Sequence, residues 1–278
     1  MPDQTVRVRP VPATADRFDA HPPEPNGTGV LLLAGSSGRV EIGRAELLAA
    51  RGPRVRATRW FGGEGQRPTP HEVPLELFIE QIAVLRRDCD RVVLFGTSFG
   101  AEAALTVGTL CPVDAVIAIA PTSVVWAGSH AGRWSSHWTL AGEPVPFTPF
   151  DHDWAPDADP PAFRGLYASS MQRFPERAAA ARIPAEKITG DVLLIVGQDD
   201  QVWPSAYFAQ QIVSARKKAG LLTTLVSHPD AGHRLLLPGE QPAAGGVRMA
   251  RGGTPKADAE LGERAWPEIL RILAPRSA

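Results

Sequence analysis

A serine between two glycines is the first candidate for chemistry in this sequence. In the stretch RVVLFGTSFGAEAAL, residues 91–105, Ser98 lies between Gly96 and Gly100. A nucleophilic serine needs small neighbours because the strand and helix that it joins pass very close to each other. Gly-x-Ser-x-Gly also occurs in ordinary turns, so the pattern alone does not assign a role. Its meaning depends on whether a base, an acid and an oxyanion hole lie elsewhere in the chain.

Histidine is the side chain best suited to take the proton of Ser98. His233 occurs in HPDAGHRLL, just beyond a late apolar run, where a loop can return over the end of a sheet. His228 lies five residues earlier, at the end of that run, and is the second candidate. We expect solvated or packing roles for the remaining histidines, which are His21, His71, His130, His137 and His152.

An aspartate that could orient the imidazole follows another apolar run, in LLIVGQDDQVWP. A carboxylate at this place would hold the histidine in its working tautomer and stabilise the imidazolium. Asp199 and Asp200 both fit, and one member of such a pair commonly caps a turn or a helix instead. Sequence spacing does not separate the two.

Backbone N–H groups that could stabilise an oxyanion are expected at two places. Phe99 follows the serine at the predicted start of a helix, where its N–H is available. The turn LAGSSGR, which follows the first apolar run, contains Ser36 and Ser37 between two glycines, and their N–H groups can point inward. All four parts of a serine hydrolase site therefore occur, in the chain order serine, acid, histidine that one hydrolase fold uses.

The segments that must position these residues alternate between strand and helix patterns. Short apolar runs predict strands at residues 30–35, 54–60, 91–96, 113–121, 191–197 and 221–228. Helical spacing predicts helices at 41–52, 74–90, 98–110 and 204–220, and a last helix that ends near residue 273. This alternation predicts a mostly parallel sheet with helices on both faces, and the serine turn indicates the α/β-hydrolase fold. We expect residues 1–278 to form a single domain of this kind.

Two segments interrupt the alternation. Residues 122–190 are rich in proline and tryptophan and are too long for an idle connection, so we predict an inserted lid. Its aromatic side chains suit the walls of an acyl pocket, or they form the core of the lid itself. The second segment, residues 234–258, is predicted to be a loop because it is rich in glycine and proline.

Composition and charge exclude several classes of partner. Lys plus Arg number 29 and Asp plus Glu number 30, so the net charge of −1 gives no electrostatic case for nucleic acid. No apolar run approaches the roughly 18 residues of a membrane span, and the N-terminus lacks the apolar core of a signal peptide. Two separate cysteines, Cys89 and Cys111, fit reduced, buried thiols. We therefore expect a cytoplasmic protein without membrane insertion.

A nucleotide-binding alternative starts from VLLLAGSSGRVEIGRAELLAARG, which resembles the opening of a short-chain dehydrogenase. Its glycines, at Gly35, Gly38 and Gly43, fit neither glycine pattern of the dinucleotide-binding folds, and Tyr-x-x-x-Lys is absent from the sequence. The sequence also contains no G-x-x-x-x-G-K-[ST] motif and no His/Cys cluster of the kind that binds metal. We expect no cofactor and no metal.

Several stretches together resemble the C-terminal α/β-hydrolase domain of the acyl-CoA thioesterases and bile acid-CoA:amino acid N-acyltransferases. They are GSSGRVEIGRAELLAARG, GTSFGAEAAL, APTSVVWAG, GQDDQVWPS, PDAGH and RGGTPKADA. In that family the nucleophile is serine in thioesterases and cysteine in amidating enzymes. The acid is the second aspartate of GxDD, and the base is the histidine of GH. The resemblance therefore implies a catalytic triad of Ser98, Asp200 and His233.

The function that this resemblance implies is cleavage of a small-molecule acyl thioester or ester through an acyl-enzyme. One alternative is an acyltransferase or cyclase that passes the acyl group to an amine or alcohol in a biosynthetic pathway. Another is a non-catalytic binding protein, because a fold does not fix a function. Several basic residues could meet the phosphates of coenzyme A or be ordinary surface charges, namely Arg133, Arg248, Arg251 and Lys256.

Overall fold

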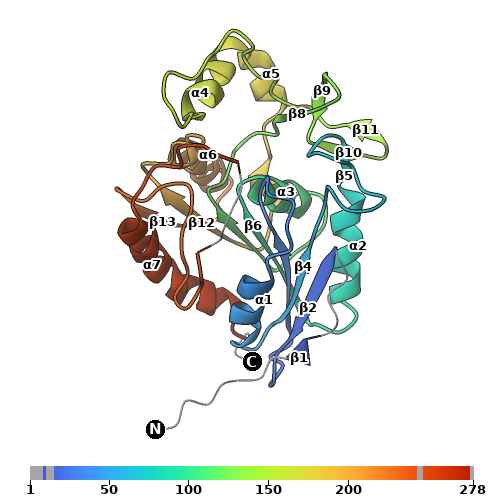
Figure 1. The fold of residues 1–278 in the computed structure, drawn as a ribbon. Coiled ribbons are helices and arrows are strands. Elements are labelled where there is room, and N and C mark those ends of the chain that lie inside the picture. Colours follow the sequence, from blue (N-terminus) through green and yellow to red (C-terminus); the bar gives the residue numbers. More distant parts are fainter. Residues whose placement is uncertain (1–8, 11–15, 243–246, 276–278) are drawn as a thin grey trace.

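A twisted sheet runs through the centre of the molecule (Figure 1). The computed structural model describes residues 9–10, 16–242 and 247–275. Within them the sheet is eight-stranded, in the order β1 (Arg9–Pro10), β2 (Arg17–His21), β4 (Arg54–Thr58), β3 (Thr28–Leu33), β6 (Arg91–Thr97), β7 (Ala115–Ile119), β12 (Asp191–Gly197) and β13 (Thr224–His228). Neighbouring strands from β4 to β13 are parallel, whereas β2 is antiparallel to both β1 and β4. The prediction of a mostly parallel sheet is confirmed.

Helices cover both faces of this sheet (Figure 1). One face carries α1 (Ile42–Ala49) and α7 (Pro255–Leu273), and the other carries α2 (Glu76–Leu85), α3 (Phe99–Gly108) and α6 (Ser205–Lys218). Alternate residues of β3 contribute to the two cores, since Val30 and Leu32 pack on the α1 side and Leu31 and Leu33 on the α3 side. Because both faces are buried, successive residues of such a strand form a continuous apolar run, here Val30–Leu33. This is why the run VLLL in the sequence predicts strand β3.

The predicted strands and helices of the sheet layers all occur, with differences at their ends, but β1 and β2 of the sheet were not predicted. β2 lies in a stretch without an apolar run, and its Asp19 is buried because it pairs with Arg56 of β4 at 2.6 Å. α7 begins at Pro255, inside the segment predicted to be a loop. The side chain of Thr254 accepts a hydrogen bond from Ala257 N and caps this helix.

The predicted burial of both cysteines is wrong. Cys89 and Cys111 are free thiols, as expected, but each is only half-buried. Cys89 lies between the end of α2 and the start of β6, and Cys111 lies between the end of α3 and the start of β7. Burial still raises the pKa of both thiols, so neither has the low pKa of a reactive cysteine.

Residues 122–190, the lid segment, fold above the carboxyl ends of the parallel strands (Figure 1). A hairpin of β8 (Ala127–His130) and β9 (Arg133–Ser136) comes first. β10 (Trp138–Leu140) then pairs with β11 (Glu143–Pro144) and with β5 (Val73–Pro74). The segment ends with α4 (Arg164–Arg173), α5 (Pro175–Ala180) and the short helix η1 (Ala185–Lys187). That it acts as the lid of one domain stays a prediction.

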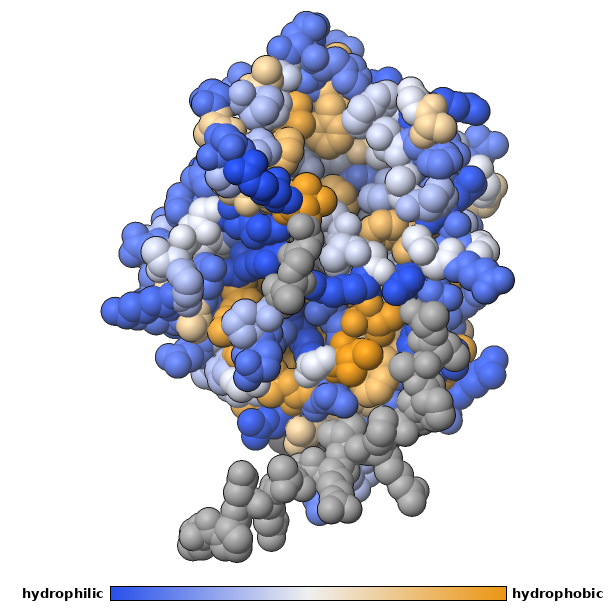
Figure 2. Space-filling model, viewed as in Figure 1, coloured by the Kyte–Doolittle hydropathy of each residue, from blue (hydrophilic) through white to orange (hydrophobic). Residues whose placement is uncertain are grey.

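Aromatic side chains form a separate core beneath the lid segment. Trp126 and Tyr167 of the lid segment pack there with Trp203, which precedes α6, and with Phe208 in the first turn of α6. Hydrophobic residues are also visible between α4 and the β8–β9 hairpin, and the top of the molecule is mainly hydrophilic (Figure 2). Among the described residues, no helix is both long enough and apolar enough to cross a membrane.

Candidate active site

Ser98 lies at a sharp turn between β6 and α3. Its φ of 58° is in the left-handed region, which costs a non-glycine residue about 1–3 kcal/mol. A Cβ atom on Gly96 would lie 2.1 Å from Gly100 O, and one on Gly100 would lie 2.3 Å from Leu33 O. No larger residue fits at either position without moving backbone. The steric argument for the two glycines is therefore confirmed.

Three side chains meet above the carboxyl ends of β6 and β12. His233 Nε2 lies 2.9 Å from Ser98 Oγ, and His233 Nδ1 lies 2.8 Å from Asp200 Oδ2. Asp200 is 1% exposed, and its other oxygen accepts hydrogen bonds from Val202 N and Trp203 N at 2.9 and 3.2 Å. With a proton on Nδ1, Nε2 can accept the hydroxyl proton of the serine. The arrangement can therefore generate a nucleophilic oxygen.

The aspartate and histidine that the sequence left as alternatives have other partners. Asp199 Oδ2 accepts a hydrogen bond from Gly253 N at 2.7 Å, which ties its turn to the loop before α7. His228 is the last residue of β13, and its Nε2 lies 2.9 Å from Glu260 Oε2. The structure thus brings Asp200 and His233, rather than these two residues, to the serine.

Both segments predicted to supply oxyanion donors lie beside Ser98. Phe99 opens α3, and the first N–H groups of a helix have no acceptor within it. In the turn after β3, Gly35 contacts the serine so closely that an added Cβ atom would lie 3.0 Å from Ser98 Cβ. Ser36 and Ser37 follow with exposed side chains. That the N–H groups of these residues form an oxyanion hole stays a prediction.

A buried ion pair joins the serine turn to the segment after His233. Arg44 of α1 donates from Nε and Nη2 to both carboxylate oxygens of Glu240, at 2.7 and 2.9 Å. Its Nη1 donates to Thr97 Oγ1 at 3.0 Å. Burial lowers the pKa of Arg44, but the Glu240 carboxylate outweighs this effect and the pKa is raised above its ordinary value. Arg44 is thus a permanent cation that stabilises the serine turn through its hydrogen bond to Thr97.

Replacing Arg44 by methionine is expected to lower the free energy of unfolding by about 3–5 kcal/mol, because Glu240 would be left buried without its partner. Urea unfolding of the Arg44→Met variant measures this. Arg248→Met is the matched control, since the side chains of Arg248 and Asp159 are both 72% exposed. It should change stability by less than about 1 kcal/mol. Equal losses in the two variants would contradict the interpretation.

Two residues near the site carry no signal that the sequence analysis recognised. Glu102, in the stretch GAEAAL, is fully buried. A charged residue among alanines directly after the serine turn is the sequence feature that could have indicated it. Tyr167 of α4 packs against Trp203 with ring centroids 5.3 Å apart. Burial, together with the charges of Glu102 and Asp200, raises the pKa of Tyr167, so this phenol stays neutral.

Among the described residues, no hydrogen bond joins the remaining histidines, or the basic residues considered for phosphate binding, to the side chains of Ser98, Asp200 or His233. His71 and His137 are buried, and His130 and His152 are exposed, which agrees with the expected packing and solvated roles. The basic residues considered for phosphate binding do not converge. Arg248 pairs with Asp159, Lys256 pairs with Glu260, Arg251 donates to carbonyls of its own loop, and Arg133 lies in the β8–β9 hairpin.

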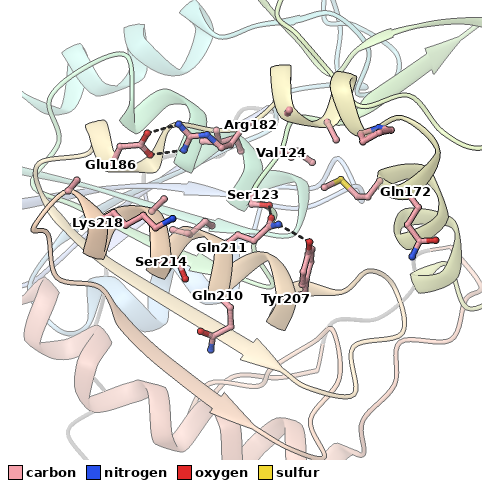
Figure 3. A pocket seen from close by; sticks show the side chains of 18 residues that line it. Ser123, Val124, Gln172, Arg182, Glu186, Tyr207, Gln210, Gln211, Ser214 and Lys218 are labelled. Atoms are coloured by element: carbon pink, nitrogen blue, oxygen red, sulfur yellow. Dashed lines mark hydrogen bonds and ion pairs between the residues drawn. The ribbon is translucent and has the colours of Figure 1, made fainter.

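A groove of about 960 Å³ lies between α5 and α6 (Figure 3). Arg182 and Glu186 form an ion pair at one side of it, and Gln211 donates to the hydroxyl of Tyr207 at 2.8 Å. The lining includes Val124, which also packs in the aromatic core beneath the lid segment, but none of the three site residues. In this structure the lid aromatics form a packed core rather than the walls of this groove.

Solved structures define the class of fold. A putative dienelactone hydrolase from Klebsiella pneumoniae has a TM-score of 0.56 and 14% identity, with 92% of this chain and 91% of that chain covered. A monoacylglycerol lipase from Paleococcus ferrophilus has a TM-score of 0.53 and 18% identity, with 92% and 97% covered. The chain therefore has the α/β-hydrolase fold, as the sequence predicts.

The particular family follows from the sequence itself. The model of the family described as BAAT / Acyl-CoA thioester hydrolase C terminal matches residues 73–275, and the chain belongs to this family. Bile acid-CoA:amino acid N-acyltransferase of Mus musculus is 27% identical over 260 residues, which are 88% of this chain and 59% of that protein. Mitochondrial acyl-coenzyme A thioesterase 2 of Mus musculus is 24% identical over 277 residues, 94% and 59% respectively. The chain thus spans about three fifths of the length of enzymes of two kinds, hydrolases and acyltransferases.

Proposed function

We propose that the protein is a serine hydrolase of the acyl-CoA thioesterase type, which cleaves an acyl thioester or ester through an acyl-enzyme. The continuous contact from Ser98 Oγ through His233 to Asp200 carries this proposal. The fold and the family relationship support it, because thioesterases are among the relatives. A serine rather than a cysteine at position 98 also favours the hydrolytic branch of the family.

In the first half of the reaction, Ser98 Oγ attacks the acyl carbonyl carbon while His233 Nε2 takes its proton. The carbonyl oxygen becomes an oxyanion, which backbone N–H groups of Phe99 and of the Ser36–Ser37 turn stabilise. The tetrahedral intermediate collapses, the carbon–sulfur bond breaks, and His233 returns the proton to the leaving thiolate. An acyl ester on Ser98 remains.

In the second half, water replaces the thiol and His233 Nε2 takes one of its protons. The hydroxide attacks the acyl ester, and the serine leaves with the proton that the imidazole returns. Asp200 holds the imidazole with Nδ1 protonated and stabilises the imidazolium in both halves. The products are a free acid and a thiol, and the enzyme is restored.

Acyl transfer is the second candidate, because an N-acyltransferase is among the relatives. An amine or alcohol would then attack the acyl-enzyme in place of water. Ser98 and His233 are each only 8% exposed, which favours exclusion of water from the acyl-enzyme and so favours transfer over hydrolysis. A non-catalytic binding protein is a weaker candidate, since binding alone does not require the three side chains to meet.

The test is a panel of acyl-CoAs, acyl-pantetheines and simple esters, with and without glycine or ethanolamine. Hydrolysis predicts that thiol and free acid appear at equal rates, and that added amine changes neither rate. Transfer predicts an amide or ester product, which mass spectrometry detects, at the expense of the acid. A binding protein would release no thiol and would not react with a fluorophosphonate probe.

A further inference from the structure

A fully buried carboxylate lies one turn beyond the serine on the same helix. Glu102 of α3 has 0% exposure. Its Oε1 accepts hydrogen bonds from Trp138 Nε1 at 2.8 Å and from Trp126 N at 3.2 Å, and it lies 3.0 Å from His137 Nδ1. All three partners belong to the lid segment. One oxygen atom therefore fixes the lid segment to the helix that carries the serine.

The aromatic ring of Phe99 packs against two other rings, those of His137 and Trp203. Its centroid is 4.4 Å from that of His137 and 5.6 Å from that of Trp203. Glu102 Oε1 lies 3.0 Å from the His137 ring nitrogen Nδ1. The Trp203 ring donates from Nε1 to Ala120 O at 3.2 Å, and the backbone N–H of Trp203 donates to Asp200. Of the two rings that contact Phe99, that of His137 is held by a carboxylate, and that carboxylate is Glu102.

The position of Phe99 matters because its backbone N–H is the proposed oxyanion donor. Such donors act on the charge that develops in the transition state, so their placement affects kcat. A displacement of about 1 Å in a catalytic site can cost roughly 100-fold in rate. Packing of the Phe99 ring against His137 and Trp203 restricts this displacement.

We propose that Glu102 is a positioning residue that holds the Phe99 amide in place through His137. This inference rests on the proposed acyl-enzyme reaction. Glu102 acts by its geometry as a hydrogen-bond acceptor, because all three contacts go to one oxygen. The other oxygen, Oε2, is buried and has no hydrogen-bond partner among the described residues. A glutamine can therefore keep the three contacts with its carbonyl oxygen and place its amide nitrogen where Oε2 lies.

Two substitutions separate geometry from charge. Glu102→Gln removes the charge and keeps the length of the side chain, so it should retain kcat within about 3-fold. Glu102→Asp keeps the charge and shortens the side chain by one methylene. It should therefore lower kcat by about 10- to 100-fold with little change in KM. Rates are expressed per active site, counted with a fluorophosphonate probe, so that a smaller folded fraction does not affect them.

A transition-state analogue gives a second readout. A trifluoromethyl ketone that adds to the serine should lose affinity in Glu102→Asp by the same factor as kcat/KM. Arg216→Met is the matched control, because Arg216 of α6 is also buried but donates to carbonyl oxygens of Ala185 and Ile188 away from the site. It should lower the melting temperature and leave the rate per labelled site unchanged.

Three results would overturn the inference. They are an unchanged kcat in Glu102→Asp, a change confined to KM, or a loss in Glu102→Gln as large as that in Glu102→Asp. The last result would mean that charge, rather than position, is what the residue supplies. Failure of the proposed function is a distinct outcome, because Ser98→Ala would then retain turnover whatever the Glu102 variants show.

Discussion

Replacing Ser98 by alanine is expected to lower kcat for thioester cleavage by about 10⁶-fold and to leave KM nearly unchanged. The loss is this large because the serine oxygen, which lies 2.9 Å from His233 Nε2, forms the covalent intermediate. Substrate binding depends on other groups and should persist. The measurement is thiol release from the best acyl thioester in the panel, with single-turnover experiments to detect the acyl-enzyme in the wild type.

Ser214→Ala is the control for this experiment, since Ser214 is an exposed residue of α6. It should react with a fluorophosphonate probe and turn over at the wild-type rate, whereas Ser98→Ala should not be labelled. Turnover by Ser98→Ala within about 100-fold of wild type would show that the reaction does not pass through this serine. The proposed mechanism would then be wrong at its first step.

The sheet could be predicted because its strands are buried on both faces. Every residue from Val30 to Leu33 is apolar, so β3 is visible as a run without any knowledge of its neighbours. The same argument does not reveal β2, because its buried Asp19 pairs with Arg56, which lies 37 positions further along the chain. A pairing of this kind depends on tertiary structure, and no local pattern indicates it.

The site could be predicted only where a local requirement restricts the residue types in the sequence. The turn around Ser98 has a local steric requirement, which Gly96 and Gly100 record in the sequence. Glu102 has no comparable requirement, since its partners come from 24 to 36 positions away and are brought to it by the pairing of β10 with β5. The sequence marks Glu102 as a charge among alanines, but its burial and its partners follow from the fold.

The choice between the two aspartates also depended on tertiary structure, and it leads to the second large effect. Asp200→Asn is expected to lower kcat by about 10⁴-fold. The asparagine oxygen would keep the contacts to Val202 N and Trp203 N, so its amide nitrogen would face His233 Nδ1. Two donors cannot share a hydrogen bond, and the imidazole would move its proton to Nε2. Nε2 would then be unable to accept the proton of Ser98.

Asp199→Asn tests this argument with the same chemical change one residue earlier. Its carboxylate accepts from Gly253 N rather than facing the imidazole, and the asparagine oxygen can still accept that hydrogen bond. The variant should therefore retain kcat within about 10-fold, since it removes no group that acts in the transition state. Losses of similar size in the two variants would mean that position 200 supports the site only as part of the turn. A selective loss at Asp200, measured as kcat at saturating thioester, would instead mean that it acts through the tautomer of His233.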